Sequence, residues 1–343
     1  MEKKISIVIP CHNCADTLFD AWRSLRSQSM DLDDLECIFV DDASDDNGAT
    51  WNKLVEIEAQ APDSVLIVHL EENMRQGGAR NVGISYATGR YLQFLDADDK
   101  LTEDACLRLY SIAEEKNADI IQFNHLLRLG DTQKVMYASA EPGDHVIEDD
   151  SDRIPFLNTT TVSYGCTNKF YRMSLIEKAQ ARFAEHCVYE EPLFVYPLFL
   201  YADRISLITD ALCVYNLHPD STVTSVIGKR LLDHPQVQLQ VLAYCMERED
   251  LFNRFRDVIG LYFLWSFYCE TLCFAAQHKG AHLPLEYYHE MQNVCRRVFP
   301  DWRDNPQFKD IDTNVKNVLE NIDRTIGSQQ ELDEFIIQVA GTI

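Results

Sequence analysis

Near its start the chain contains Ile5-Ser6-Ile7-Val8-Ile9, followed directly by Pro10. A short run of apolar, mostly β-branched residues is typical of a strand covered on both faces, and the proline ends it. The same pattern recurs, with helical spacing between the runs. Strands are predicted at 5–9, 35–40, 65–68, 91–95 and 120–123, with helices at 15–28, 49–59, from 77 onward and at 102–116. This alternation predicts an α/β protein with a Rossmann-like, mostly parallel sheet and helices on both faces.

The second half of the chain has a different pattern. Residues 125–150 are polar and are expected to form a long connection. A helix is predicted after Glu191, with strands near 205–208 and 211–216. Beyond about 230 only helical periodicity remains, which predicts an all-helical C-terminal region. We therefore expect one domain over 1–228, made of halves 1–124 and 125–228, and a helical domain over 229–343.

Composition and charge limit the function. The 343 residues carry 55 acidic and 31 basic side chains, so the formal net charge is -24. Nucleic acid is excluded as the main partner, because a polyanion is met by clustered Lys and Arg, and an anionic membrane surface is disfavoured for the same reason. The apolar run at the N-terminus is too short for a signal peptide, which predicts a cytoplasmic protein. The 11 cysteines are odd in number and irregularly spaced, and fit buried small hydrophobes better than a disulfide framework.

One apolar stretch, 258–276, resembles a membrane span but contains Glu270. A carboxylate at mid-membrane costs about 2.5–3.5 kcal/mol on insertion scales. We therefore expect a central helix of the C-terminal bundle. A homodimer face or a surface peripheral to the inner face of the membrane is the alternative, because the stretch is rich in aromatic residues.

Acidic residues follow two of the predicted strands. Asp96 and Asp98 come after 91–95, and strand alternation points them to the same side. Such carboxylates repel each other unless a cation such as Mg²⁺ or Mn²⁺ lies between them, although a polar turn would use the same residues. Asp42 ends the strand 35–40, where it would accept hydrogen bonds from a nucleoside or form an Asx turn. Arg80 follows two glycines at a helix start and can pair with phosphate oxygens.

Taken together, these segments resemble family 2 glycosyltransferases, which are inverting enzymes with the glycosyltransferase A fold. The matching blocks are residues 5–13, 40–46, 78–83, 87–91 and 94–99. Three later blocks resemble the acceptor-side blocks of the family: residues 168–172, 189–194 and 218–221. The resemblance therefore covers about 1–225 and does not extend to the helical region.

The resemblance implies a role for each matching residue. The backbone near Pro10 would contact the nucleoside of the donor, Asp42 its uracil-type base, and Arg80 would lie near the nucleotide. Asp96 and Asp98 match the metal-binding DxD motif, with Asp96 also beside the nucleotide.

The catalytic base is less well defined by the resemblance. Glu191 falls at the position of the base, which in the family is usually the Asp of a Glu-Asp pair, so that Glu190 and Glu191 are alternative bases. His218 would approach the metal or the diphosphate, or is a packed loop histidine.

The implied function is transfer of a sugar from a nucleotide-diphospho-sugar, UDP-linked in the first instance, to a hydroxyl of a glycan or lipid-linked glycan. Mn²⁺ or Mg²⁺ would assist a single displacement, and polysaccharide assembly is what the family most often serves. Two alternatives remain. The Glu at the base position is compatible with a non-catalytic sugar-binding or scaffolding homologue. A sugar nucleotidyltransferase is disfavoured, because no Gly-rich basic loop follows the first strand.

Overall fold

The computed structural model describes residues 3–130, 132–138, 141–158, 163–216, 227–278, 280–309 and 311–340. The chain separates into two compact units. The first consists of 1–153 with 161–218, and the second of 154–160 with 219–343. The division after residue 228 that the sequence suggests, and the halves within the first domain, stay predictions.

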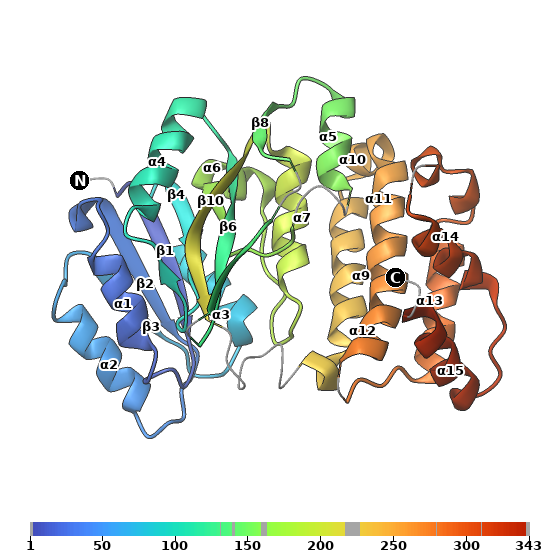
Figure 1. Cartoon of the computed structure of the whole chain (residues 1–343), viewed down its shortest axis with the longest axis horizontal. Coiled ribbons are helices and arrows are strands. Elements are labelled where there is room, and N and C mark those ends of the chain that lie inside the picture. Colours follow the sequence, from blue (N-terminus) through green and yellow to red (C-terminus); the bar gives the residue numbers. More distant parts are fainter. Residues whose placement is uncertain are drawn as a thin grey trace. The chain divides into compact units, whose positions relative to one another are not determined.

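The first unit is an α/β structure (Figure 1). Its strands are β1 (Ile5–Cys11), β2 (Leu35–Asp41), β3 (Val65–His69), β4 (Tyr91–Phe94), β5 (Lys100–Leu101), β6 (Ile120–Leu129), β7 (Thr132–Met136), β8 (Gly143–Val146), β9 (Lys169–Arg172) and β10 (Arg204–Asn216). Its helices are α1 (Leu18–Arg26), η1 (Leu32–Asp34), α2 (Ala49–Glu58), α3 (Arg75–Tyr86), α4 (Ala105–Lys116), α6 (Met173–Ala179) and α7 (Glu191–Tyr201). Helix α5 (Asp150–Leu157) contains residues of both units.

The sheet is mixed rather than mostly parallel. Its strand order is β3-β2-β1-β4-β9-β6-β10-β5, with β7 beside β6 and β8 beside β10. The first four strands in this order are parallel, as predicted from the alternation of strands and helices. Strand β9 then runs antiparallel to both of its neighbours, β4 and β6. The carboxyl ends of β1, β2 and β4 therefore meet at one edge of the sheet, which is the edge that bears the acidic motifs.

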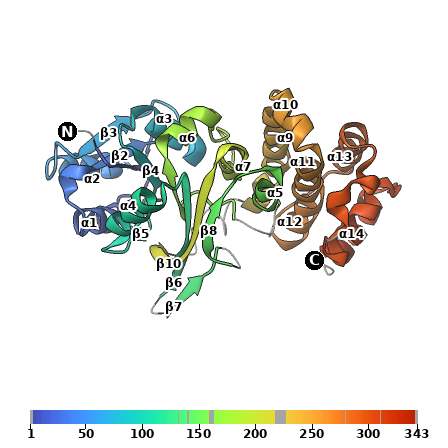
Figure 2. The same ribbon diagram turned by 90° about the horizontal axis from the view of Figure 1, so that it is seen from above.

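The alternation within β1 determines which helices cover each face of the sheet. Ile7 lies in a buried cluster that includes residues of α1, α2 and α4, namely Trp22, Leu25, Leu54, Ile57, Leu109 and Ile112. The next residue, Val8, points to the opposite face and lies under α3. A Cβ on Gly83 would lie 2.3 Å from Cγ1 of Val8, so this helix lies as close to the sheet as a glycine permits. Figure 2 shows α3 and α6 on one side of the strands and α1 and α4 on the other.

The prediction of a long connection over 125–150 is wrong. Strand β6 continues to Leu129, turns, and pairs antiparallel with β7 from His125 to Leu129. Strand β8 then pairs with the start of β10. The polar side chains that suggested a loop lie on strands at the margin of the sheet, where one face is exposed: β7 and β8 are mostly exposed. The strands predicted at 205–208 and 211–216 form one strand, β10, with shifts of register near Ala211.

The described part of the second unit consists of helices joined by turns and short irregular segments and contains no strand, which confirms the prediction for this region. Its elements are η2 (Ile227–Arg230), α9 (Asp233–Met246), α10 (Glu249–Arg254), α11 (Arg256–Phe263), the π-helix η3 (Leu264–Glu270), α12 (Thr271–Gln277), α13 (Leu285–Val298), η4 (Trp302–Asp304), η5 (Pro306–Phe308), α14 (Thr313–Glu320), η6 (Asn321–Asp323) and α15 (Gln329–Ala340). Helix α15 begins at a cap in which the backbone N–H of Glu331 donates to Oγ of Ser328 at 3.2 Å.

The apolar stretch of the sequence forms one helix of 22 residues, Arg256–Gln277, which contains an 18-residue apolar window with a mean hydropathy of 1.5. Its length and composition would allow it to cross a membrane, but 78% of its apolar window is buried. The core helix of a soluble protein passes the same test. Phe263 and Phe267 stack within it at 4.7 Å, and Tyr262 donates to Oε1 of Gln238 at 2.7 Å. This burial favours the central bundle helix that the sequence predicts.

All 11 cysteines are free thiols. Nine of them are buried, whereas Cys14 and Cys187 are half-buried. The prediction that these side chains serve as small hydrophobes in place of a disulfide framework is confirmed.

Candidate functional site

The nucleoside end of the candidate site lies where β1 and β2 end side by side, with Pro10 paired to Val40. Asp42 follows β2 and is 3% exposed. Its own backbone N–H donates to the carbonyl of Cys11 at 2.7 Å, and its Oδ1 accepts from the backbone N–H of Met74 at 2.7 Å. Burial raises the pKa of the Asp42 carboxyl, and the hydrogen bond from Met74 partly offsets this. Asp42 therefore fastens the start of α3 to the ends of the first two strands.

The neighbouring Asp41 was not singled out in the sequence. It is 1% exposed, and its Oδ2 pairs with Nδ1 of His69 at 2.8 Å. Its Oδ1 accepts from the backbone N–H of Ser44 at 3.2 Å. The signal that could have identified this contact is the position of His69 at the end of β3, directly beside Asp41 in the sheet register.

Arg80 connects two segments that are far apart in the sequence. It lies on α3 and is 2% exposed. Its Nη2 donates to Oδ1 of Asp96, which follows β4, at 2.8 Å, and its Nη1 donates to Oε1 of Glu190, just before α7, at 2.5 Å. Its guanidinium also lies 5.3 Å from the centroid of the Phe183 ring. In this structure Arg80 therefore acts on the site through the two carboxylates that it holds.

Gly77 makes this contact possible. A Cβ on Gly77 would lie 2.1 Å from the carbonyl oxygen of Ala184 and 3.0 Å from Cβ of Glu190. Gly77 thus allows α3 to lie directly against the segment that precedes α7.

In the buried cluster of Arg80, Asp96 and Glu190, burial and the neighbouring charges shift the pKa values in opposite directions. Burial lowers the pKa of the Arg80 guanidinium, but the surrounding negative groups, including Asp96 and Glu190, raise it by more. Burial raises the pKa of the Glu190 carboxyl, and the charge of Arg80 acts in the opposite direction. Glu190 is only 5% exposed and binds the guanidinium directly, so its role in the fold is to pair with Arg80.

Glu191 is the first residue of α7 and is less buried than Glu190. Its Oε1 accepts from the backbone N–H of Cys166 at 2.6 Å. Pro192 follows it in the first turn of the helix, a position where the missing N–H has no intrahelical partner in any case. Cys166 was not identified from the sequence. Its contact is made by the backbone N–H, which every residue except proline carries, so the residue type gives no sign of it.

The acidic turn after β4 is held together by backbone contacts and by β10. The N–H of Asp99 donates to the carbonyl of Asp96 at 3.0 Å. At the end of β10, the backbone N–H of Asn216 donates to Oδ1 of Asp99 at 2.8 Å and its Nδ2 donates to the carbonyl of Asp98 at 2.6 Å. Burial, followed by the charge of Asp96, raises the pKa of Asp99 to about 9, and its Oδ2 is buried without a hydrogen-bond partner among the described residues. The turn thus places several carboxyl groups close to one another.

This donor set fits a hard divalent cation that takes its remaining ligands from a phosphate. Within the described part of the chain, however, no group of three or more His, Cys, Asp or Glu side chains lies close enough to hold a metal. The third ligand predicted from the sequence, His218, lies outside the described residues. Among the described residues, a cation would draw on Asp96 and Asp98, with further ligands from its substrate.

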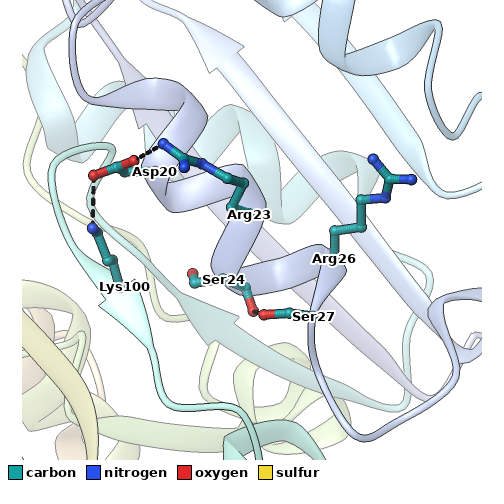
Figure 3. A pocket seen from close by; sticks show the side chains of 6 residues that line it. All are labelled: Asp20, Arg23, Ser24, Arg26, Ser27 and Lys100. Atoms are coloured by element: carbon teal, nitrogen blue, oxygen red, sulfur yellow. Dashed lines mark hydrogen bonds and ion pairs between the residues drawn. The ribbon is translucent and has the colours of Figure 1, made fainter.

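A surface hollow of about 540 Å³ lies beside α1 and is lined by Asp20, Arg23, Ser24, Arg26, Ser27 and Lys100 (Figure 3). Asp20 lies between Arg23 and Lys100 and pairs with both, whereas Arg26 extends away from them. None of the residues predicted to act in catalysis or donor binding lines this hollow.

Comparison with known proteins identifies the family. A model described as glycosyl transferase family 2 matches residues 6–179, about half of the chain. The chain belongs to this family. The resemblance stated from the sequence is thereby confirmed.

Curated relatives match about two thirds of the chain. Poly(ribitol-phosphate) beta-N-acetylglucosaminyltransferase TarP of Staphylococcus aureus is 29% identical over 210 residues, which are 61% of this chain and 61% of TarP. Poly(ribitol-phosphate) beta-glucosyltransferase of Bacillus spizizenii is 29% identical over 224 residues, which are 65% of this chain but 34% of that protein. The match thus spans between about a third and two thirds of the length of these relatives.

Solved structures extend the likeness to both units. The structure of S. aureus TarS 1–349 in complex with UDP-GlcNAc superimposes with a TM-score of 0.69 at 18% identity, covering 99% of this chain and 91% of that one. A mannosyltransferase of Pyrobaculum calidifontis in complex with GDP-Man and Mn²⁺ gives a TM-score of 0.50 at 14% identity. At these identities the likeness establishes the fold, including the helical region after the α/β unit.

Proposed function

We propose that this family 2 member is an inverting glycosyltransferase that moves a sugar from a UDP-sugar to a hydroxyl of a glycan or lipid-linked glycan. The observation that carries the proposal is the double grip of Arg80 on Asp96 and Glu190. Because one guanidinium binds both carboxylates, the acidic turn after β4 lies next to the start of α7. Because Glu190 is committed to Arg80, Glu191 is the carboxylate that we assign to proton transfer.

The donor side supports the same function. Pro10 and Asp42 border the carboxyl ends of adjacent parallel strands, which is where such sheets bind nucleotides. The fold neighbour TarS was solved with UDP-GlcNAc, and the relatives named above transfer N-acetylglucosamine or glucose to poly(ribitol phosphate). UDP-GlcNAc and UDP-glucose are therefore the first donors to test, and phosphate-containing polysaccharides the first acceptors.

Asp96 and Asp98 would hold Mg²⁺ or Mn²⁺, with His218 as a further candidate ligand. Such an ion supplies positive charge that stabilises a leaving diphosphate. The ion would add positive charge to a turn in which Asp96 is met by the buried Arg80 and Asp99 is buried against its acidic neighbours.

In the chemical step, Glu191 accepts the proton of the acceptor hydroxyl as its oxygen attacks the anomeric carbon. The bond from that carbon to the diphosphate breaks on the opposite face, so the configuration inverts. The hydrogen bond from Cys166 to Oε1 of Glu191 fixes the direction in which the carboxylate presents its second oxygen. A positioned general base typically contributes about 10²–10⁴-fold to the rate.

The direct test incubates the protein with a panel of nucleotide sugars and acceptors, with Mn²⁺, Mg²⁺ or EDTA, and follows products by mass spectrometry. We expect release of UDP that EDTA suppresses, and a fall of about 10²–10⁴-fold in Glu191→Gln with UDP binding unchanged. Glu190→Gln is the matched control, since it retains an oxygen for Arg80.

Each contrary outcome has a defined meaning. Full activity of Glu191→Gln removes Glu191 from the mechanism, and transfer that is insensitive to EDTA removes the cation. Binding of UDP-sugar without turnover of any donor on the panel indicates a non-catalytic homologue. Formation of a nucleotide sugar from a sugar phosphate and a nucleoside triphosphate indicates a nucleotidyltransferase.

A further inference from the structure

Lys169, the first residue of β9, has a fully buried ammonium group. Its Nζ donates to the carbonyl of Gly165 at 2.6 Å, to Oδ1 of Asn168 at 3.0 Å and to Oγ of Ser163 at 3.1 Å. A protonated lysine has three N–H donors, and here each has an acceptor. Burial lowers the pKa of Lys169 to about 7, and the negative charge of Glu191 acts in the opposite direction. Burying an amino group in this way is costly, so its contacts need an explanation.

All three acceptors belong to one short segment, residues 163–168. The same segment is also held by a residue of β4 and by a second residue of β9: Nε2 of Gln93 donates to the carbonyl of Thr167 at 2.9 Å, and the hydroxyl of Tyr171 donates to the carbonyl of Cys166 at 3.2 Å. Lys169 is the centre of these contacts, because it binds the beginning, middle and end of the segment at once.

The segment delivers one contact to the proposed active site. The backbone N–H of Cys166 lies between Gly165 and Thr167, both of which are fixed through their carbonyls, and it donates to Oε1 of Glu191 at 2.6 Å. A displacement of the segment by about an ångström would break this bond, and misplacement on that scale can cost about 10²-fold in rate.

We propose that Lys169 is a positioning residue for catalysis: by fastening residues 163–168 it holds the Cys166 N–H on Glu191 and thereby orients the base toward the acceptor. The inference rests on the proposed function, in which Glu191 is the base. Lys169 itself touches neither donor nor acceptor. Its effect should therefore appear in turnover through Glu191 and not in the affinity for the nucleotide.

A double-mutant cycle tests this coupling with UDP-GlcNAc first, and otherwise with the donor that the panel identifies. Lys169→Met is expected to lower kcat by about 10–100-fold, the size typical of outer-shell partners, while the Kd for UDP stays unchanged. In a Glu191→Gln background the same substitution should change kcat less than about threefold, because the base that it positions is already gone. The control is Lys178→Met, which removes an exposed lysine from α6.

A second measurement does not depend on activity. Protein labelled with ¹⁵N-cysteine gives amide signals from its 11 cysteines, and Cys166→Ala assigns the one from Cys166. We expect the Cys166 signal to move upfield, and its hydrogen exchange to accelerate, in Glu191→Gln, in Lys169→Met and, to a smaller extent, in Ser163→Ala. Ser163→Ala removes a single acceptor and serves if Lys169→Met does not fold.

Two results would overturn the inference. One is a Cys166 signal that is unchanged in both Lys169→Met and Ser163→Ala. The other is a loss of kcat on Lys169→Met that is equally large with and without Glu191, since a purely structural role would act in both backgrounds. Failure of the proposed function is separate from these, because it appears as full activity of Glu191→Gln alone.

Discussion

Replacing Arg80 with methionine should destabilise the first unit strongly. The guanidinium binds Asp96, whose side chain is 22% exposed, and Glu190, whose side chain is 7% exposed. Methionine keeps much of the volume but leaves Glu190 as a buried carboxylate without its counter-charge. Removing one partner of a buried ion pair typically costs about 3–5 kcal/mol. For a unit of roughly this size each kcal/mol lowers Tm by about 2–4 °C, so we expect a fall of about 6–20 °C.

The carboxyl group of Glu190 also determines how the stability loss of Arg80→Met should depend on pH. Burial raises the pKa of Glu190 in the folded protein, and Arg80 is the charge that opposes this. Without Arg80, ionisation of Glu190 therefore disfavours folding, and the deficit of the variant should grow as the pH rises above about 4.3, the ordinary value for glutamate. Calorimetric melts at pH 5 and pH 8 measure this, and the difference between variant and wild type should be larger at pH 8.

The double variant decides whether the reasoning is correct. Arg80→Met with Glu190→Gln removes both the cation and the carboxylate that it leaves behind, so most of the lost stability should return. If the double variant melts as low as Arg80→Met alone, the loss comes from packing and the electrostatic explanation is refuted. Arg90→Met serves as a matched control, because Arg90 is half exposed in its pair with Glu114 and such pairs contribute about 0–1 kcal/mol.

Three further outcomes follow from the site. Asp98→Ala should weaken UDP-sugar binding and abolish its dependence on Mn²⁺ together, as measured by calorimetric titration; unchanged donor affinity would contradict the bridging cation. Glu191→Asp should lower turnover, although aspartate is usual in the family. The shorter side chain would withdraw from the Cys166 N–H, which lies 2.6 Å from Oε1 of Glu191. An equal or higher kcat would show that this contact does not matter. Gly77→Ala should cost about 1–3 kcal/mol, measured by urea unfolding, because its Cβ would lie 2.1 Å from the carbonyl oxygen of Ala184; wild-type stability would mean that α3 can move aside.

The sequence predicts the first part of the fold well, because buried parallel strands leave a strong local signal. The run 5–9 and its counterparts become β1 to β4, and the helices between them fall where the apolar spacing predicts. The hairpin of β6 and β7 was missed for a physical reason. Strand β7 lies at the margin of the sheet with polar side chains exposed, so nothing in its composition separates it from a loop.

The sequence singles out the carboxylates that we propose for the site, whose roles stay predictions, but not the contacts that connect them. Asp42, Asp96 and Glu191 could be identified because they follow strands or begin a helix in recognisable blocks. The pairing of Glu190 with Arg80 joins residues 110 positions apart, and a single sequence holds no record of such a contact. The contributions of Cys166 and Asn216 are made largely by backbone groups, which every residue type carries.

The distribution of thiols provides natural reporters on the two sides of this site. Cys14 lies in the loop between β1 and α1, on the nucleoside side, and Cys187 lies three residues before Glu190. These two are half-buried while the other nine are buried. A thiol-directed fluorophore should therefore modify the native protein first at these two positions. Replacing either Cys14 or Cys187 with serine would leave a single label at the other position. The two singly labelled proteins could then be used to follow the order of donor and acceptor binding, without introducing a new residue for labelling.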